Sequence, residues 1–374
     1  MGDLEAKSHE LTKEEHFRVL DELVEMGCFW ILYTGGEIFA RKDFLEIYTY
    51  AKNKGFLITL FTNGTIINEQ IADHLAEWPP FAIEITLYGR TRETYEALTM
   101  VPGSYDRCLR GIKLLKERGL PLKLKTVATS INKHEVMAMR RFAEDELGLE
   151  FKTDGQINPR IDCSQSPLAV RLSTEELVAL DMANPKTKSE YLRLALDGLQ
   201  KPGLSEIDTL YFCGGGLNSF SINALGEMSI CTTSQQETFS VRECETKEIW
   251  QKALLQVRSR KRTRITKCSQ CRIQSLCGMC PANGELENGD KESPVEFLCQ
   301  LAHLRAAALG LEVPAHGDCE FCVGGSERAQ IEESVRRIEN KEIDVEGWVG
   351  PQQILPILNN SSAAAIGCAG CGSH

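Results

Sequence analysis

Short apolar runs alternate with amphipathic segments along the first part of the chain. Residues 12–27 carry apolar side chains at helical spacing, at Phe17, Leu20, Leu23 and Val24. Thr12 and Glu15 have the spacing of a capping box, and Gly27 follows the last apolar position. The pattern therefore predicts an amphipathic helix at the start of the ordered chain.

Five short apolar runs predict strands, at residues 29–33, 57–62, 82–87, 122–128 and 150–153. The segments between them predict helices, at residues 43–54, 68–77, 105–118 and 133–147. Strands that alternate with helices through short turns indicate parallel βαβ units and hence an α/β fold. The pattern begins on a helix, whereas a parallel barrel normally begins on a strand.

The rest of the chain is less regular. We expect a strand at Leu168–Leu172, a capped helix from Ser173, a helix near 189–199 and another near 326–340. We divide the chain into a partial barrel, a helical bridge, a cysteine-rich module and a tail, at residues 1–172, 173–204, 205–303 and 304–374.

Composition excludes several classes of protein. The 374 residues are 42% hydrophobic and carry a net charge of -11, which argues against nucleic acid as the main partner. No apolar run is long enough to span a membrane, and the N-terminus lacks the apolar core of a secretory signal. We therefore expect a cytoplasmic protein without a membrane or nucleic-acid partner, in which the paired cysteines among the 15 bind metal rather than form disulfides.

Cysteines are concentrated between residues 213 and 299. Cys213 and Cys231 precede a C-x2-C-x5-C-x2-C run, and one more cysteine follows it: Cys268, Cys271, Cys277, Cys280 and Cys299. Thiolates are soft ligands that suit iron–sulfur clusters and zinc. The alternative is a set of buried thiols or disulfides, but this spacing rarely arises by chance.

Four motifs together resemble a known family. They are YTGGEIF at 33–39, FTNG at 61–64, ITLYG at 85–89 and the cysteine pattern at 213–299. In this order they resemble radical S-adenosylmethionine (SAM) proteins with a C-terminal SPASM domain, over roughly residues 11–303. The resemblance implies a partial (β/α)6 TIM-like barrel without its first strand, followed by a cysteine-rich SPASM iron–sulfur domain and a C-terminal tail.

The resemblance also implies a SAM site at the strand ends, formed by Gly35, Gly36, Glu37, Asn63, Thr86, Lys125 and Arg171. The first three would contact the α-amino group of SAM, and Thr86 would lie near its ribose. Some of these residues also have structural interpretations. Asn63 suits a turn before Gly64, and the two cations suit solvated positions. No catalytic residue is assigned.

Two auxiliary [4Fe–4S] clusters are implied by the same resemblance. The first would take Cys213, Cys231 and Cys280, and the second would take Cys268, Cys271, Cys277 and Cys299. The gap between Cys277 and Cys280 is x2 where the family often has x3, and the first cluster has only three cysteines. Its fourth ligand stays open among Asp208, Glu206, an exogenous thiol or substrate, and none.

The family also carries a C-x3-C-x2-C loop after the first strand, which holds the cluster that binds and cleaves SAM. No such triplet occurs in the 374 residues. We therefore expect that the chain as given lacks the first strand and this loop, and that it does not generate the 5′-deoxyadenosyl radical.

The tail contains two further C-x2-C pairs, Cys319–Cys322 and Cys368–Cys371, with His316 and His374 nearby. Two such pairs suit a tetrahedral zinc or single-iron site. The alternatives are a tail that mimics a peptide substrate and a flexible tail with unrelated thiols.

These patterns favour a radical SAM/SPASM-type maturase that modifies a peptide or protein. Its auxiliary clusters would transfer electrons or bind substrate, and its reductant would be a protein such as ferredoxin or flavodoxin. The alternative is a non-catalytic iron–sulfur protein that acts in electron transfer or as a scaffold.

Overall fold

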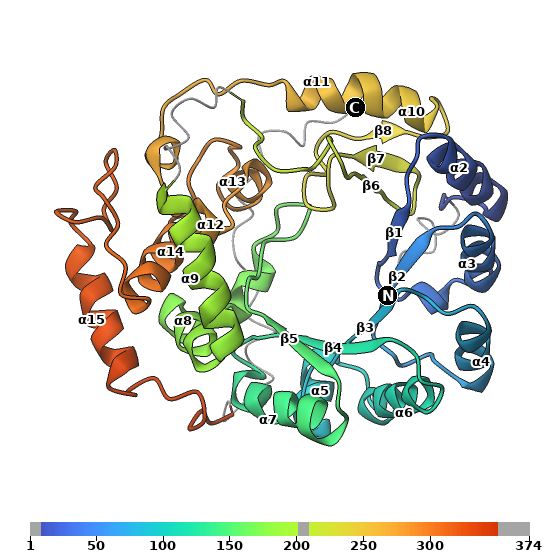
Figure 1. Cartoon of the computed structure of the whole chain (residues 1–374), viewed down its shortest axis with the longest axis horizontal. Coiled ribbons are helices and arrows are strands. Elements are labelled where there is room, and N and C mark those ends of the chain that lie inside the picture. Colours follow the sequence, from blue (N-terminus) through green and yellow to red (C-terminus); the bar gives the residue numbers. More distant parts are fainter. Residues whose placement is uncertain (1–8, 201–208, 351–374) are drawn as a thin grey trace.

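The computed structural model describes residues 9–200 and 209–350, whose elements follow one another around a ring (Figure 1). Five parallel strands form one sheet in the order of the chain: β1 (Trp30–Tyr33), β2 (Leu57–Thr62), β3 (Ala82–Thr86), β4 (Leu122–Val127) and β5 (Glu150–Asp154). The five strands expected from the apolar runs are therefore confirmed, together with the α/β class.

Helices cover the outer face of this sheet. They are α2 (Lys13–Glu25), η1 (Ile38–Ala40), α3 (Phe44–Asn53), α4 (Glu69–Glu77), α5 (Arg92–Thr99), α6 (Ser104–Glu117), η2 (Lys133–Glu135), α7 (Val136–Arg141) and η3 (Phe142–Glu146). The core between sheet and helices is apolar, with fully buried Ile58, Leu60, Ile83, Ile85 and Leu124. Helix α5 was not expected from the sequence.

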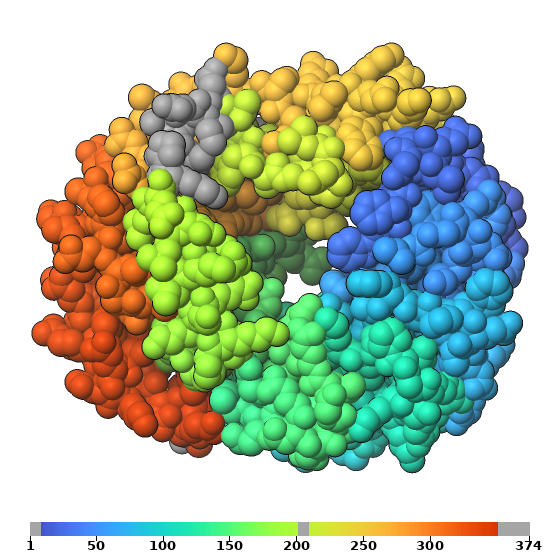
Figure 2. Space-filling view, in the orientation of Figure 1, coloured from blue at the N-terminus to red at the C-terminus, as the bar shows by residue number. Residues whose placement is uncertain are grey.

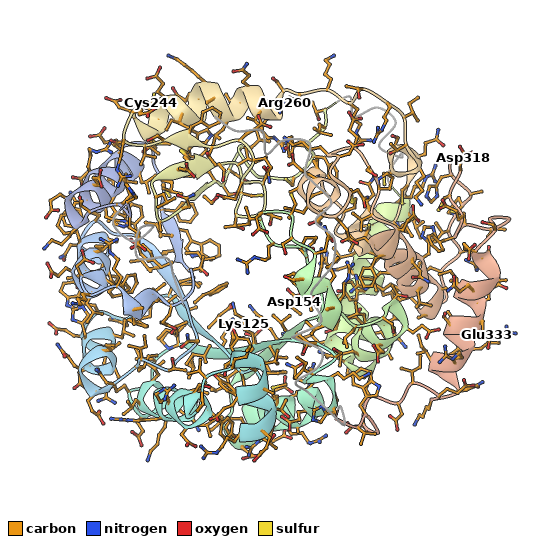
Figure 3. All side chains as sticks on the ribbon, turned by 180° about the vertical axis from the view of Figure 1, so that it is seen from behind. Lys125, Asp154, Cys244, Arg260, Asp318 and Glu333 are labelled. Carbon is orange, nitrogen blue, oxygen red and sulfur yellow. The ribbon has the colours of Figure 1, made fainter. Side chains whose placement is uncertain are left out.

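The inner face of the sheet carries charged side chains on β3, β4 and β5. Lys125 on β4 and Lys152 on β5 are adjacent in register, and both reach Glu84 on β3, with Nζ–Oε distances of 3.2 Å and 3.0 Å. Figure 3 labels Lys125 and Asp154 on the inner side of the ring. The space-filling view shows an opening at the centre of this ring (Figure 2). The sheet therefore presents charged groups to an open interior rather than to a packed barrel core.

The expected strand at Leu168–Leu172 is wrong. This segment forms a 3-10 helix, η4 (Ser166–Val170), with Pro167 in its first turn. Proline has a fixed φ that suits the first turn of a helix, and a short apolar run does not by itself distinguish a helix from a strand. The two expected bridge helices are confirmed as α8 (Thr174–Ala183) and α9 (Pro185–Gln200).

The C-terminal half completes the ring. A small antiparallel sheet contains β6 (Ser221–Ile222), β7 (Glu227–Ser229) and β8 (Phe239–Ser240). The following helical segments are α10 (Thr246–Glu248), η6 (Ile249–Leu254), α11 (Leu255–Arg258), η7 (Lys267–Gln270), α12 (Gln274–Cys277), α13 (Pro281–Asn288), α14 (Glu296–Ala308) and α15 (Arg328–Glu339). Helix α15 confirms the helix expected near 326–340.

Helix α2 joins the partial barrel to the cysteine-rich module. Its Glu15 accepts a hydrogen bond of 2.6 Å from Arg242, and its Glu22 accepts one of 2.8 Å from the backbone amide of Thr246. Just before the helix, the amide of Leu11 donates to the carbonyl of Ala224 at 2.8 Å. These contacts close the ring on one side. Within the described ranges, 9–200 and 209–350, no helix is long and apolar enough to cross a membrane.

Candidate metal centres and cofactor rim

Four cysteines line one pocket in the cysteine-rich module. They are Cys268 on η7, Cys271 just after it, Cys277 at the end of α12 and Cys299 on α14. The pocket has an empty volume of about 350 Å³, and Val295 and Ala302 contribute apolar wall. The sequence assigned these same four residues to the second auxiliary cluster. Four convergent thiols in a mostly apolar pocket fit an iron–sulfur cluster.

The three cysteines assigned to the first cluster also converge. A Cβ atom on Gly215 would lie 3.5 Å from the Cys213 Sγ and 3.7 Å from the Cys231 Cβ. Burial raises the pKa of the Cys280 thiol, and the neighbouring thiols of Cys231 and Cys213 raise it further. The backbone amide of Ser234 donates to the Cys231 Sγ at 3.3 Å. Three thiols beside a glycine backbone fit a soft metal centre, whereas Glu206 and Asp208 lie outside the described residues.

A third group of ligands was not expected in this combination. His303, His316, Cys319 and Cys322 are all buried, and their ligand atoms lie within 4.8 Å of one another. The sequence instead paired Cys319 and Cys322 with Cys368 and Cys371, which lie outside the described residues. The third group adjoins the four-cysteine pocket, because hydrogen bonds to Cys271 and Cys319 raise the pKa of His316 to about 10.

The glycine pair after β1 leaves open space. Gly35 has a φ of +151°, and a Cβ at either Gly35 or Gly36 would meet no atom within 4 Å. The Glu37 carboxylate turns towards the end of β2, where it accepts hydrogen bonds from the Thr62 hydroxyl at 2.7 Å and the Asn63 amide at 2.8 Å. This rim fits a small polar ligand, with a carboxylate available beside exposed backbone.

The other residues expected to bind SAM have protein partners. The Asn63 side chain accepts from the Thr65 amide at 2.9 Å, as expected for a turn residue. Thr86 and Lys125 are neighbours in register across β3 and β4. The Lys125 ammonium lies 3.0 Å from the centre of the Phe61 ring, and burial lowers its pKa.

The Arg171 side chain contacts residues of the cysteine-rich module. Its guanidinium makes a bidentate ion pair with Glu287 at 2.9 Å and 3.0 Å and lies 4.0 Å from the Phe297 ring centre. The structure therefore brings Glu37 and Asn63 together, and Thr86 and Lys125 together. Arg171 instead joins the segment before α8 to α13 and α14.

Comparison with known families bears on the first half of the chain. Residues 3–143 match the Radical SAM superfamily. This match covers β1 to β4 and the glycine-rich rim after β1, which are the elements that the motifs had indicated. The chain carries a radical SAM domain.

Several curated proteins are similar to this chain. An AdoMet-dependent heme synthase of Methanosarcina barkeri is 24% identical over 298 residues, which cover 75% of this chain and 85% of the relative. A PqqA peptide cyclase of Granulibacter bethesdensis is 28% identical over 142 residues, which cover 38% of each protein. The heme synthase thus aligns through the cysteine-rich half as well, whereas the peptide cyclase aligns over a much shorter stretch.

Solved structures share the fold of this chain. Streptococcus suis SuiB bound to its precursor peptide SuiA aligns with a TM-score of 0.59 and 18% identity, over 78% of this chain and 69% of SuiB. Native anSMEcpe with bound AdoMet aligns with a TM-score of 0.54 and 16% identity, over 79% and 88% of the two chains. At these identities the likeness establishes the fold, and the cysteine-rich half agrees with the SPASM-type arrangement expected from the sequence.

Proposed function

We propose that the chain is a radical SAM maturase of the SPASM type that modifies a peptide or protein. The observation that carries this proposal is the convergence of two sets of thiols across the ring from a polar, open sheet face. Cys268, Cys271, Cys277 and Cys299 form one set. Cys213, Cys231 and Cys280 form the other. SuiB binds a precursor peptide, and a peptide cyclase is among the relatives, which supports a peptide substrate.

Residues at the strand ends would bind SAM, and residues of the cysteine-rich module would bind the auxiliary clusters. Glu37 and the backbone of Gly35 and Gly36 would hold the amino group of SAM, and Lys125 on the inner sheet face would meet a carboxylate. In this family SAM supplies a 5′-deoxyadenosyl radical that takes a hydrogen atom from the substrate. The two sets of thiols would hold auxiliary clusters, which accept an electron from the substrate or bind it, while the protein orients the reactants and excludes water.

We further propose that these 374 residues do not cleave SAM by themselves. The support is the sequence, which contains no C-x3-C-x2-C triplet. The seven cysteines of the two sets lie in the cysteine-rich module rather than at the β1 rim. Formation of 5′-deoxyadenosine by the anaerobically reconstituted chain, with dithionite as reductant, would contradict this part of the proposal.

The cluster assignment is tested by metal analysis after anaerobic reconstitution with iron and sulfide. Wild-type protein should be brown, and Cys271→Ser and Cys213→Ser should each lose roughly half of the iron, because each removes a ligand of a different cluster. Cys244→Ser is the control, since Cys244 is exposed and belongs to neither set. A colourless, iron-free wild-type protein would refute the proposed function.

A second candidate is a tetrapyrrole-modifying enzyme. The heme synthases align over 75% of this chain, whereas the peptide cyclases align over 36–38%. We would titrate the reconstituted protein with Fe-coproporphyrin III and follow the porphyrin absorption. A saturable change with about one porphyrin per chain would favour the tetrapyrrole substrate, and its absence would favour the peptide.

A further inference from the structure

We propose that His303, His316, Cys319 and Cys322 bind a zinc ion next to the second auxiliary cluster. His303 lies on α14, and the other three lie in the loop between α14 and α15. All four side chains are buried and bring their ligand atoms within 4.8 Å of one another. This inference does not depend on SAM chemistry and extends the function proposed above.

The distances between the ligand atoms are those of a small tetrahedral site. His303 Nε2 lies 3.3 Å from the Cys322 Sγ and 3.5 Å from the Cys319 Sγ. The His316 Nδ1 lies 3.0 Å from the Pro314 carbonyl, which leaves Nε2, 3.9 Å from the Cys322 Sγ, to bind the ion. Zinc bonds of about 2.1 Å to nitrogen and 2.3 Å to sulfur place neighbouring ligand atoms about 3.6 Å apart. The four side chains therefore need little movement to enclose the ion.

The histidine on α14 is oriented for metal binding. Its Nδ1 lies 2.8 Å from the backbone carbonyl of Cys299, so Nδ1 carries the proton and donates it to this oxygen. The lone pair of Nε2 is then free and directed at both thiols. Zinc-binding histidines commonly use their second nitrogen in this way, because the hydrogen bond fixes the ring and its tautomer. His303 is 1% exposed, so solvent does not compete for this nitrogen.

The donor set indicates zinc rather than another iron–sulfur cluster. Two thiolates and two imidazoles in a closed tetrahedron are typical of structural zinc sites, whereas clusters are usually held by thiolates alone. Cys319 and Cys322 are separated by two residues on one tight turn, in which the Cys322 amide donates to the Cys319 carbonyl at 3.4 Å. With four protein ligands the site has no open position, so we assign it a structural role.

The site would fix a ligand of the neighbouring cluster. Cys299 and His303 lie one turn apart on α14, and the Cys299 Sγ is 3.9 Å from His303 Nδ1. Lys267, next to Cys268, forms an ion pair of 2.7 Å with Glu320 in the zinc loop. Asp318, which precedes Cys319, is labelled at the outer side of the ring in Figure 3. The zinc would therefore anchor this outer loop to α14 and to the start of the four-cysteine pocket.

Metal content tests the proposal. The chain is produced with zinc and iron, purified anaerobically and assayed for both metals. We expect about one zinc per chain in the wild type and less than about a tenth of that in His303→Ala and Cys322→Ser, with iron largely retained. His303→Cys should keep its zinc, since cysteine also binds this metal. Cys371→Ser and Cys244→Ser should also keep theirs.

Two outcomes would overturn the proposal. Unchanged zinc in Cys322→Ser would show that the group does not bind it, and loss of iron in proportion to zinc would make these residues cluster ligands. If His303→Ala does not fold, loading the wild type with cobalt shows whether the group binds a metal ion. A tetrahedral cobalt–thiolate spectrum that zinc abolishes supports the site, and its absence refutes it. Loss of zinc in Cys371→Ser would mean that Cys368 and Cys371, rather than the two histidines, are the zinc ligands.

Discussion

Glu37 joins the ends of two neighbouring strands. Its carboxylate follows β1 and accepts hydrogen bonds from Thr62 and Asn63 at the end of β2. The Thr62 hydroxyl in turn accepts from the Gly64 amide at 3.0 Å. The residue expected to hold the amino group of SAM is therefore also part of the architecture of the rim.

Replacing Glu37 by alanine should lower the free energy of unfolding by about 1–3 kcal/mol, because the Thr62 hydroxyl and the Asn63 amide lose a charged acceptor. Denaturant unfolding at pH 7 measures this loss. Glu14→Ala is the control, since Glu14 is exposed on α2, and should change stability by less than about 0.5 kcal/mol. Equal effects of the two substitutions would contradict the structural role.

The cysteines that the sequence grouped lie near one another in the structure, whereas the approach of His303 to Cys319 and Cys322 was not expected. Cysteine spacing is informative because C-x2-C turns bring two sulfurs together whatever the surrounding fold. His303 lies among apolar residues of α14, and only its separation of four residues from Cys299 placed the two on one helix face. Its approach to Cys319 depends on how the following loop returns, which no local pattern specifies. Arg171 illustrates the same limit, because its partner Glu287 lies 116 residues away.

At the scale of elements, α2 has a larger role than its sequence suggests. The predicted capping box is confirmed, with Thr12 and Glu15 each accepting from the other's backbone amide. Its flank contacts the small antiparallel sheet through Glu15 and Arg242. His16, on the same helix, is partly buried near Arg41, and burial together with this cation lowers its pKa to about 4.

This histidine predicts a pH dependence of stability. The folded protein holds His16 neutral, so the unfolded chain binds more protons between its pKa near 6.5 and the folded value near 4. His16 does not reduce the free energy of unfolding above pH 6.5. As the pH drops towards 4, protonation of His16 in the unfolded chain lowers the free energy of unfolding by up to about 3 kcal/mol. The positive charge of Arg41 lowers the pKa of His16. The negative charges of Asp43 and Glu15 raise it, but by less.

The predicted pH dependence is tested by measuring the free energy of unfolding of the wild type and of His16→Gln from pH 7 to pH 4.5 at constant ionic strength. The wild type should lose more stability than the variant over this interval. Parallel pH profiles would show that His16 makes no contribution.

Periodicity predicted most elements but not all of them. The five strands follow from apolar runs, since the outer face of each must pack on helices. Helix α5 was missed because it is only eight residues long, with two buried side chains, Thr94 and Tyr95. The strand expected at Leu168–Leu172 is wrong because its apolar run outweighed the signal of Pro167, which lies in the first turn of η4.

At the scale of the whole molecule, the sheet has an exposed apolar edge. Among the described strands β1 pairs only with β2. Phe29 is 68% exposed and Trp30 55%, and Leu32, Leu57 and Phe81 are exposed nearby. An apolar edge strand with free backbone groups tends to pair with another chain.

We therefore expect this chain to self-associate at high concentration, and Leu32→Lys to reduce the association severalfold, because a charge on an edge strand disfavours pairing. Light scattering over a concentration series measures the degree of self-association. Ile265→Lys is the matched control, since Ile265 is 86% exposed but lies in the loop before η7. Monodisperse wild-type protein at every concentration would contradict the prediction.

The arrangement around α14 has a consequence for biosynthesis. A nascent chain that has emerged up to Cys299 already has all four sulfurs of the pocket, but the segment that packs against His303 follows some 17 to 23 residues later. The scaffold that orients the last sulfur is thus translated after the sulfur itself. Iron delivery to this pocket should accordingly be a late, post-translational event.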